Sequence, residues 1–257
     1  MFSAPGWDTC LVHSGAKAPR HEDWEPSDGL KIETGNLTPA RWLEQRPPHT
    51  DGFGTVTGVC APGFDAYARV FHPARLGEEP VRWDRVAAVY GRSVSEGTRW
   101  HELIGARDPI RYRNDDTPAV PGVWDEHPQE GPTPADVART LISVLSQHTR
   151  TFDRCWYGPW DGYGHYDWDD TPVFRTPGRD EILLAGPLDD ADSPAQDPHE
   201  AWLETPDLWW PQDRAWCVGG DVDLVSTYVG GSAACVAHLL ATPGLEAYAV
   251  AETSTVH

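Results

Sequence analysis

The sequence predicts an α+β fold, made mainly of antiparallel sheet with a few packed helices. Strand-like segments follow one another with few helical segments between them, whereas a doubly wound fold alternates the two. Pro-Gly and Gly-Gly pairs at 62–63, 177–178 and 219–220 provide tight turns between such segments. The 257 residues are 39 % hydrophobic and include 13 Trp, which is enough apolar material to bury a core.

Composition divides the chain into two parts. In residues 1–48, Gly, Pro, Ser and charged residues break every period, so we expect an irregular N-terminal segment. Residues 49–257 are expected to form a single α+β domain. A loop-like stretch at 105–132, rich in Pro, Gly and charges, is the place where this domain could be subdivided.

Apolar spacing and helix-start signals predict the helices. Apolar residues at 83, 86, 87 and 90 follow the i, i+3, i+4, i+7 pattern of an amphipathic helix. Thr133-Pro134 gives an N-cap followed by a proline in the first turn. The expected helices are 38–44, 83–90, 98–104, 133–148, and one that begins at Gly230-Gly231-Ser232 and stops before Pro243.

Extended segments are predicted where β-branched and aromatic residues gather between turns. Val56, Thr57 and Val59, for example, favour extended backbone. Residues 187–207 hold five Asp, two Glu and four Pro, so we expect a surface loop there. The expected strands are 54–59, 66–72, 154–160, 172–174, 181–185, 215–218, 221–224 and 245–250.

Negative charge is concentrated in the C-terminal half. Residues 151–257 contain 19 Asp and Glu but four Arg and no Lys, a net −15 of the total −20. A field of one sign attracts basic partners and repels nucleic acids, phosphates and anionic membranes. We therefore expect a basic protein partner, and neither a nucleic acid nor a membrane.

The lack of recognisable targeting signals and the pattern of cysteines lead us to expect a cytoplasmic protein. The N-terminus has no basic start followed by an apolar run, so we expect no signal peptide, and no stretch of about 18 apolar residues could span a membrane. The five cysteines are odd in number and lack CxxC pairing, which is typical of reduced, buried thiols. The sequence indicates no cofactor and leaves the oligomeric state open.

The densest group of polar and aromatic side chains lies between Cys155 and Asp170. Trp and Tyr are common anchors of protein interfaces, and His with Asp can approach a metal ion. The alternative is that the Trp rings pack on the core while the Asp side chains face water. A His-x-Asp pair supplies too few ligands to assign a metal site. The candidate binding residues are Trp156, Trp160, Tyr163, His165, Asp167, Trp168, Asp169 and Asp170.

Other motifs carry weaker signals, and the catalytic residues remain unknown. Asp221 and Asp223, two apart on an expected strand, would share one face and could bind metal or divide acid and base roles, but a turn explains them equally well. Tyr228–Ser232 could cradle an anion, although Ser232 as a plain N-cap suffices. His72 beside Pro73 fits a structural histidine, and no GxSxG signature occurs.

Several segments resemble a family of uncharacterised actinobacterial proteins, a resemblance that implies no activity. Together they span about residues 50–250. They are PGFDAYARVFHP at 62–73, VRWDRV at 81–86, DRCW at 153–156, WDGYG at 160–164, PGR at 177–179, DRAWCV at 213–218 and DVDLVSTYVGGS at 221–232. The chain is also similar to SUKH-superfamily immunity proteins, acidic α+β proteins that neutralise toxins. That similarity rests on charge, on the expected element types and on the strand near Trp216.

Three functional hypotheses follow. The first is a cytoplasmic acidic binding protein, of the immunity type, whose Trp-rich acidic face binds a basic partner protein. The second is a small enzyme of unknown reaction that uses His165 or His72 with Asp carboxylates. The third is a divalent-metal-binding protein with its site in the acidic half.

Overall fold

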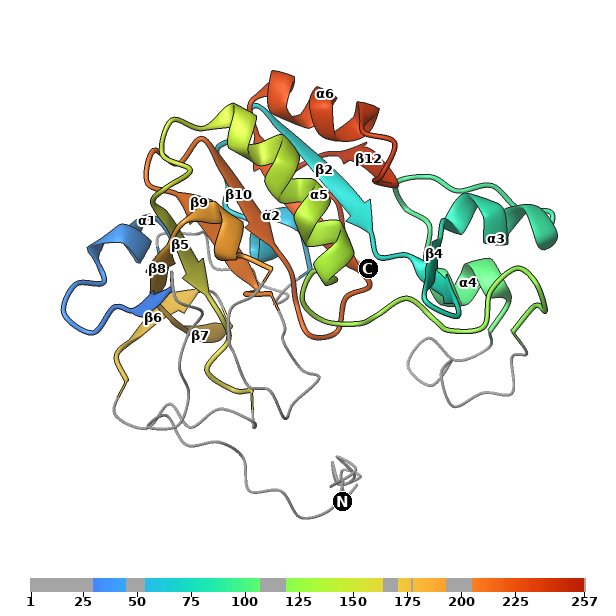
Figure 1. The fold of residues 1–257 in the computed structure, drawn as a ribbon, viewed down its shortest axis with the longest axis horizontal. Coiled ribbons are helices and arrows are strands. Elements are labelled where there is room, and N and C mark those ends of the chain that lie inside the picture. Colours follow the sequence, from blue (N-terminus) through green and yellow to red (C-terminus); the bar gives the residue numbers. More distant parts are fainter. Residues whose placement is uncertain are drawn as a thin grey trace, which may run out of the picture.

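A large antiparallel sheet organises the molecule, which confirms the α+β class (Figure 1). The computed structural model describes residues 30–44, 54–106, 119–163, 171–176, 178–192 and 205–256. The sheet has eight strands in the order β1-β8-β5-β9-β10-β11-β2-β12. These strands are β1 (Lys31–Ile32), β2 (Ala66–Phe71), β5 (Cys155–Gly158), β8 (Leu184–Gly186), β9 (Leu208–Pro211), β10 (Trp216–Gly219), β11 (Ser226–Gly231) and β12 (Ala247–Val250). Two hairpins accompany it, β3 (Ala74–Leu76) with β4 (Glu79–Val81) and β6 (Val173–Thr176) with β7 (Arg179–Ile182).

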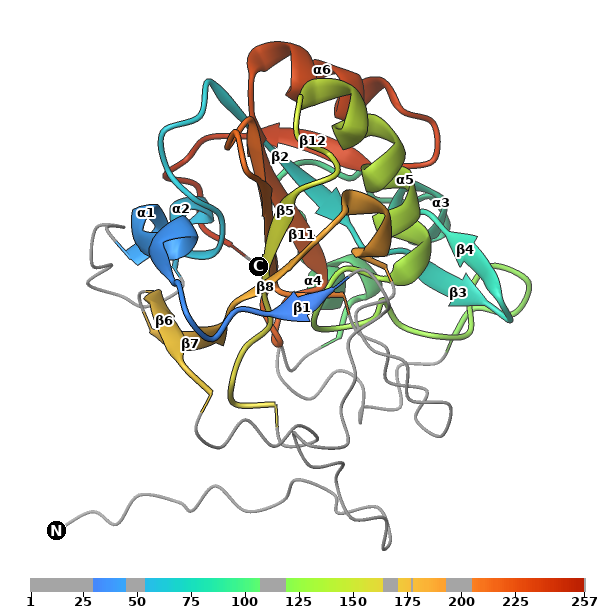
Figure 2. The same ribbon diagram turned by 60° about the vertical axis from the view of Figure 1, so that its left-hand side comes forward.

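Helices cover both faces of the sheet. α5 and α6 pack on one face, whereas α1 and α2 pack on the other (Figure 2). α3 and α4 lie beside the sheet with the β3–β4 hairpin and share a third apolar cluster with Phe71 (Figure 1). The helices are α1 (Arg41–Glu44), α2 (Val56–Val59), α3 (Trp83–Val89), α4 (Trp100–Ile104), α5 (Ala135–Leu145) and α6 (Ala233–Ala241), with 3-10 turns η2 (Thr38–Ala40), η3 (Ser146–His148) and η4 (Leu188–Asp190).

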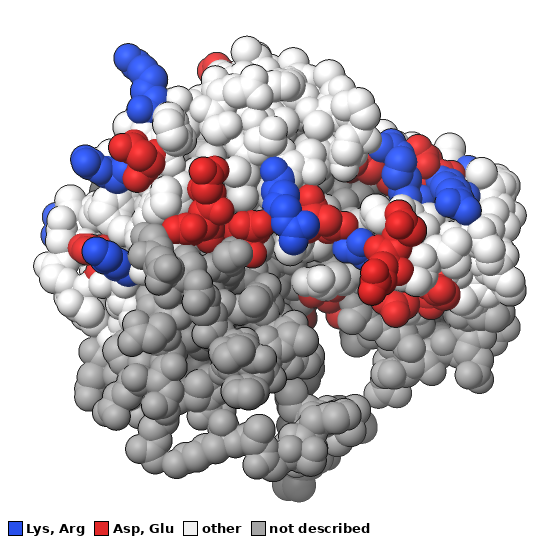
Figure 3. Space-filling view, viewed as in Figure 1, with Lys and Arg blue, Asp and Glu red and all other residues white. Residues whose placement is uncertain are grey.

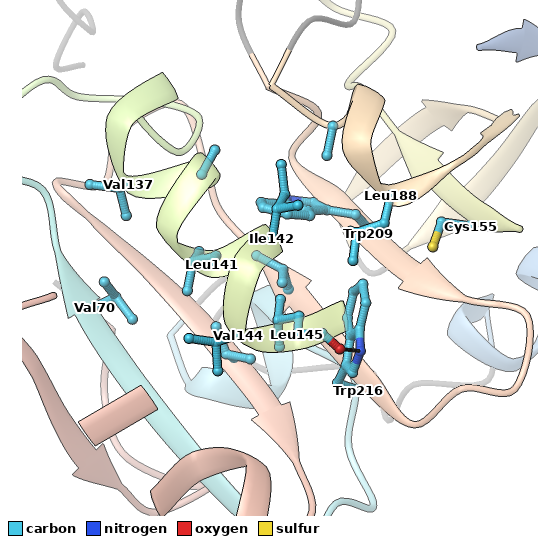
Figure 4. Packing of buried hydrophobic residues seen from close by; sticks show 14 of the residues in the cluster. Val70, Val137, Leu141, Ile142, Val144, Leu145, Cys155, Leu188, Trp209 and Trp216 are labelled. Atoms are coloured by element: carbon cyan, nitrogen blue, oxygen red, sulfur yellow. Dashed lines mark hydrogen bonds between the residues drawn. The ribbon is translucent and has the colours of Figure 1, made fainter. Parts of the chain in front are cut away.

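The predicted helix at 133–148 is confirmed as α5 followed by η3. Its side chains point toward Trp209 and Trp216 of the sheet (Figure 4). The Trp216 indole N–H donates to the carbonyl of Leu145 at 3.1 Å, so this ring is hydrogen-bonded and the end of α5 is held in place. Thr133, predicted as the N-cap, does not cap this helix; Pro134 occupies that position.

The predicted strand at 54–59 is wrong, because Val56–Val59 form the short helix α2. All four α2 residues are buried on the sheet. A Cβ atom built on Gly219 of β10 would lie 2.2 Å from the Val59 carbonyl oxygen, so glycine is what permits this close approach. Burial against the sheet outweighs the extended preference of the β-branched residues.

The expected strand at 221–224 is also wrong. Asp221 and Asp223 belong to a turn in which the Asp223 N–H donates to the Asp221 carboxylate at 3.0 Å. The strand is β11, which begins at Ser226 and is buried along its whole length. Ser232 is the N-cap of α6, as expected, and accepts the Cys235 N–H at 3.2 Å.

Three further expectations concern the N-terminal segment, the acidic segment 187–207 and the apolar face of α6. Residues 30–44 contribute β1 to the main sheet and buried side chains to the cores, so this part of the N-terminal 48 residues is integrated with the rest. In the acidic segment 187–207, Leu188 and Asp207 are buried near its two ends, and residues 193–204 lie outside the described residues. The apolar residues of the helix that starts at Ser232 predict that both Leu239 and Leu240 are buried; Leu239 is buried, but Leu240 is 40 % exposed.

No helix within the described ranges is long and apolar enough to cross a membrane. Four of the five cysteines are described, and all four are buried free thiols. Burial raises the pKa of Cys155 to about 12 and that of Cys235 to about 11, so both stay protonated and unreactive at neutral pH.

Candidate functional site

Buried polar side chains gather at one end of the sheet. There, β5 and β10 end while β9 begins, because Leu208 pairs with both Gly158 and Gly219. Asp207 precedes β9, Asp221 follows β10, and Arg179 opens β7 beside them. The antiparallel register thus brings together three charged residues that are distant in sequence.

Arg179, Asp207 and Asp221 form one ion cluster, called here the Arg179 cluster. Arg179 Nη2 lies 2.5 Å from Asp221 Oδ2, and Nη1 lies 3.9 Å from Asp207 Oδ1. The three side chains are between 2 and 8 % exposed. Burial raises the pKa of Asp207 to about 6 and also raises the pKa of Asp221, because one guanidinium does not fully compensate two desolvated carboxylates.

Asp207 holds the turn that follows β5. Its carboxylate accepts the backbone N–H of Trp160 and the hydroxyl of Tyr163, both at 2.9 Å. The Arg179 guanidinium lies over the Trp160 ring, 4.7 Å from its centroid. Gly162 packs against the same ring, since a Cβ there would lie 2.2 Å from it. Buried charges and a glycine therefore fix the position of Trp160.

Trp160 and Arg179 also line an open cavity of about 480 Å³. Two acids stand in its wall, Asp161 and Asp180, held together by the Asp161 N–H, which donates to the Asp180 carbonyl at 3.0 Å. Burial and the neighbouring Asp180 raise the pKa of Asp161. The exposed Arg175 lies 3.4 Å from Asp180. A half-buried aromatic ring beside paired carboxylates suits the cationic side chain of a partner.

The structure brings two of the predicted binding residues, Trp160 and Tyr163, into this site. Trp156 lies on β5 away from the cavity, half-buried, with its indole N–H donating to Gln212 at 2.8 Å. The remaining five candidates fall outside the described residues, and their positions stay predictions. They are His165, Asp167, Trp168, Asp169 and Asp170.

The sequence analysis did not identify Arg179 and Asp207 as site residues. It placed Asp221 on an expected strand beside Asp223, not in an ion cluster. One signal was present: Arg179 is among only four basic residues in the C-terminal half, so a role as an internal counter-ion was worth considering. Asp207 offered no such signal, because it ends a long acidic segment whose residues look alike in sequence.

A second buried polar group, the His72 cluster, lies at the same end of the sheet. His72 is fully buried; its Nδ1 donates to the Gln129 carbonyl at 2.7 Å and its Nε2 accepts the Thr227 hydroxyl at 2.9 Å. Thr227 in turn lies 2.7 Å from the Thr133 hydroxyl. Burial lowers the pKa of His72 to about 4, so the imidazole is neutral and sealed, as a structural histidine requires.

A second cavity, of about 340 Å³, lies between α5, the loop before β12 and the β4–α3 connection. Its polar groups are engaged in the fold. The Glu246 carboxylate accepts the backbone N–H groups of Trp83 and Asp84 at the start of α3, and Arg82 donates to the Leu245 carbonyl at 3.0 Å. Within the described ranges, no three His, Cys, Asp or Glu side chains gather as a metal site.

Acidic side chains, with basic side chains interspersed among them, form a band across one face of the molecule (Figure 3). No family model matches the chain, and neither a curated protein nor a solved structure matches it. The candidate site therefore rests on geometry and charge.

Proposed function

We propose that this chain is a cytoplasmic acidic binding protein that uses the surface around Trp160 to bind a basic partner protein. The observation that carries the proposal is the fixed turn from Trp160 to Tyr163, clamped by Asp207 and Arg179 beside an open cavity. Two carboxylates and two guanidinium groups line this cavity, and each guanidinium already pairs with a carboxylate of the chain. An anchor whose position is set before binding loses little entropy on association.

The charge distribution supports a basic partner. Beyond residue 150, the described residues include 13 Asp and Glu and four Arg. Arg179 is compensated internally by Asp207 and Asp221, and Arg175 pairs with Asp180. Ten acidic residues and two Arg of this part lie outside these pairs, and their net negative charge favours rapid encounter with a cationic protein.

An immunity-type role fits these properties. A protein that neutralises a basic toxin needs an acidic surface with aromatic anchors, and the resemblance to SUKH-superfamily immunity proteins points the same way. The α+β fold with its large antiparallel sheet is compatible with this role.

An enzyme is the second candidate, favoured by the raised pKa of Asp207, since a carboxyl group with a pKa of about 6 suits proton transfer near neutral pH. Asp207 is 2 % exposed, however, and both of its oxygens already accept hydrogen bonds. The buried His72 offers no accessible base either. These contacts favour a structural clamp over catalysis.

The test is capture of the partner from a native lysate of the source cells, followed by binding kinetics with the purified pair at low and moderate salt. We expect the association rate to fall as salt rises. Trp160→Ala should raise the dissociation rate, because it removes the anchor. Neutralising Asp167, Asp169 and Asp170 together should slow association while the fold stays intact.

A matched pair of charge variants localises the effect. Asp161→Asn in the cavity wall should slow association more than Asp153→Asn, which makes the same charge change at the opposite end of β5. Equal effects of the two variants, or an unchanged dissociation rate for Trp160→Ala, would contradict the proposed surface. Measurable turnover of a small substrate that depends on Asp207 would favour the enzyme.

A further inference from the structure

Two histidines meet at the end of the sheet where β10 begins, opposite to the end that holds the Arg179 cluster. His148 ends η3 and His238 lies on α6, and His148 Nε2 is 3.0 Å from His238 Nδ1. Their ring centroids are 5.3 Å apart, with 68° between the ring planes. Both side chains are half-buried, so solvent reaches the pair.

The protein scaffold sets this short distance. η3 continues α5, whose end is held by the hydrogen bond from Trp216 to the Leu145 carbonyl. On α6, Leu239 is fully buried in the same apolar cluster as Leu145, and the Thr242 hydroxyl donates to the His238 carbonyl at 2.8 Å. Because both elements pack on one core, the two ring nitrogens are positioned before any ligand arrives.

The contact has two chemical interpretations. In one, a ring N–H donates to the lone pair of the other ring. In the other, neither contacting nitrogen carries a proton. Their two lone pairs would then repel each other, and a cation bound to both nitrogens removes this repulsion. Metal–imidazole bonds of about 2.0–2.1 Å across a 3.0 Å separation give a ligand–metal–ligand angle of about 91–97°. That angle suits tetragonal or octahedral ions such as Cu²⁺ and Ni²⁺ better than tetrahedral Zn²⁺.

We propose that His148 and His238 form a two-histidine chelate site for a divalent transition-metal ion, Cu²⁺ or Ni²⁺. The described part of the chain supplies no third His, Cys, Asp or Glu ligand, so water or an external ligand completes the coordination and the ion is exchangeable. The site braces η3 against α6. It is independent of the proposed partner surface, because it shares no residue with the Arg179 cluster.

The charge of the protein favours a bound cation at this site. The net charge of −20 lowers the free energy of any bound cation. Mg²⁺, which prefers oxygen ligands, is not expected to bind this pair.

The experiment is calorimetric titration of the full chain, stripped with EDTA, with Ni²⁺ and with Mg²⁺. Two variants remove one ligand each, His148→Gln and His238→Gln. His101→Gln, a half-buried histidine on α4, is the matched control. We expect the wild type and the control each to bind one more Ni²⁺ ion than either ligand variant. The Mg²⁺ titrations should show no such difference between the four proteins. Ni²⁺ should raise the melting temperature of the wild type and control by an increment that both ligand variants lose, since a ligand of the folded state stabilises it.

Electron paramagnetic resonance of the Cu²⁺ form gives a second readout, in which hyperfine coupling to two nitrogens should be lost in both ligand variants. Equal Ni²⁺ stoichiometry in the wild type and both ligand variants would overturn the proposal, and so would the absence of Ni²⁺ binding. Either result would leave the pair as an N–H···N hydrogen bond.

Discussion

The two buried polar clusters at the end of the sheet differ in charge although they are neighbours. The Arg179 cluster places one guanidinium between two carboxylates and adjoins an open cavity. The His72 cluster is a neutral chain from the imidazole through Thr227 to Thr133 and is sealed. Thr205 links the two regions, because its hydroxyl donates to the Thr133 carbonyl and it lies two residues before Asp207.

The two clusters differ in the energetic cost of burying their polar groups. A neutral network satisfies buried polar groups at low cost, whereas each buried ion carries a desolvation penalty of several kcal/mol. Of these two clusters, the charged one fixes Trp160 at the cavity, and the neutral one joins His72 to the neighbouring strand and loop. We infer that the Arg179 cluster serves the binding surface more than it serves stability.

The largest expected effect comes from breaking the charged cluster. Arg179→Ala leaves Asp207 and Asp221 buried without their counter-ion and should lower the free energy of unfolding by about 3–5 kcal/mol. Urea denaturation at pH 7 measures it. Arg154→Ala, at an exposed arginine of the same half, is the control and should change it by less than about 0.5 kcal/mol. A loss below about 1 kcal/mol for Arg179→Ala would show that the carboxylates do not depend on this cation.

The apolar core supplies a reference for both clusters. Leu141→Ala and Leu239→Ala remove fully buried side chains and should each cost about 2–5 kcal/mol. Leu240→Ala, next in sequence but 40 % exposed, should stay within about 0.5 kcal/mol. The same urea series measures all three. A large loss for Leu240→Ala would mean that another surface covers this side chain in solution.

The two clusters are separated most directly by their opposite response to pH. His72 titrates near 4 when folded and near 6.5 when unfolded, so its stabilising contribution is complete above pH 6.5 and is lost as pH falls toward 4. Asp207 titrates near 6 when folded and near 3.8 when unfolded, so its contribution is complete below pH 3.8 and is lost as pH rises through 6.

Unfolding free energies measured between pH 4 and pH 7 check this contrast. As the pH falls, the His72→Gln variant should lose less stability than the wild type, because the contribution of His72 is lost on acidification. The Asp207→Asn variant should lose more stability than the wild type, because the contribution of Asp207 grows on acidification. Parallel curves for the wild type and both variants would show that neither group changes its pKa on folding.

By itself, the sequence determined the features that depend on neighbours along the chain. The apolar period of α5 and the Ser232 cap of α6 were predictable because helix signals repeat within a few residues. The acidic half and the aromatic residues Trp160 and Tyr163 were likewise visible as composition.

Only the tertiary structure decided the elements and contacts that depend on distant partners. α2 is helical because Gly219 lets its backbone approach the sheet, and β11 is a strand because β2 and β10 flank it. The Arg179 cluster joins side chains from three separate segments, and no local period encodes their meeting. Burial and strand register act across the whole chain, so the partners of a charged residue emerge only when the sheet has formed.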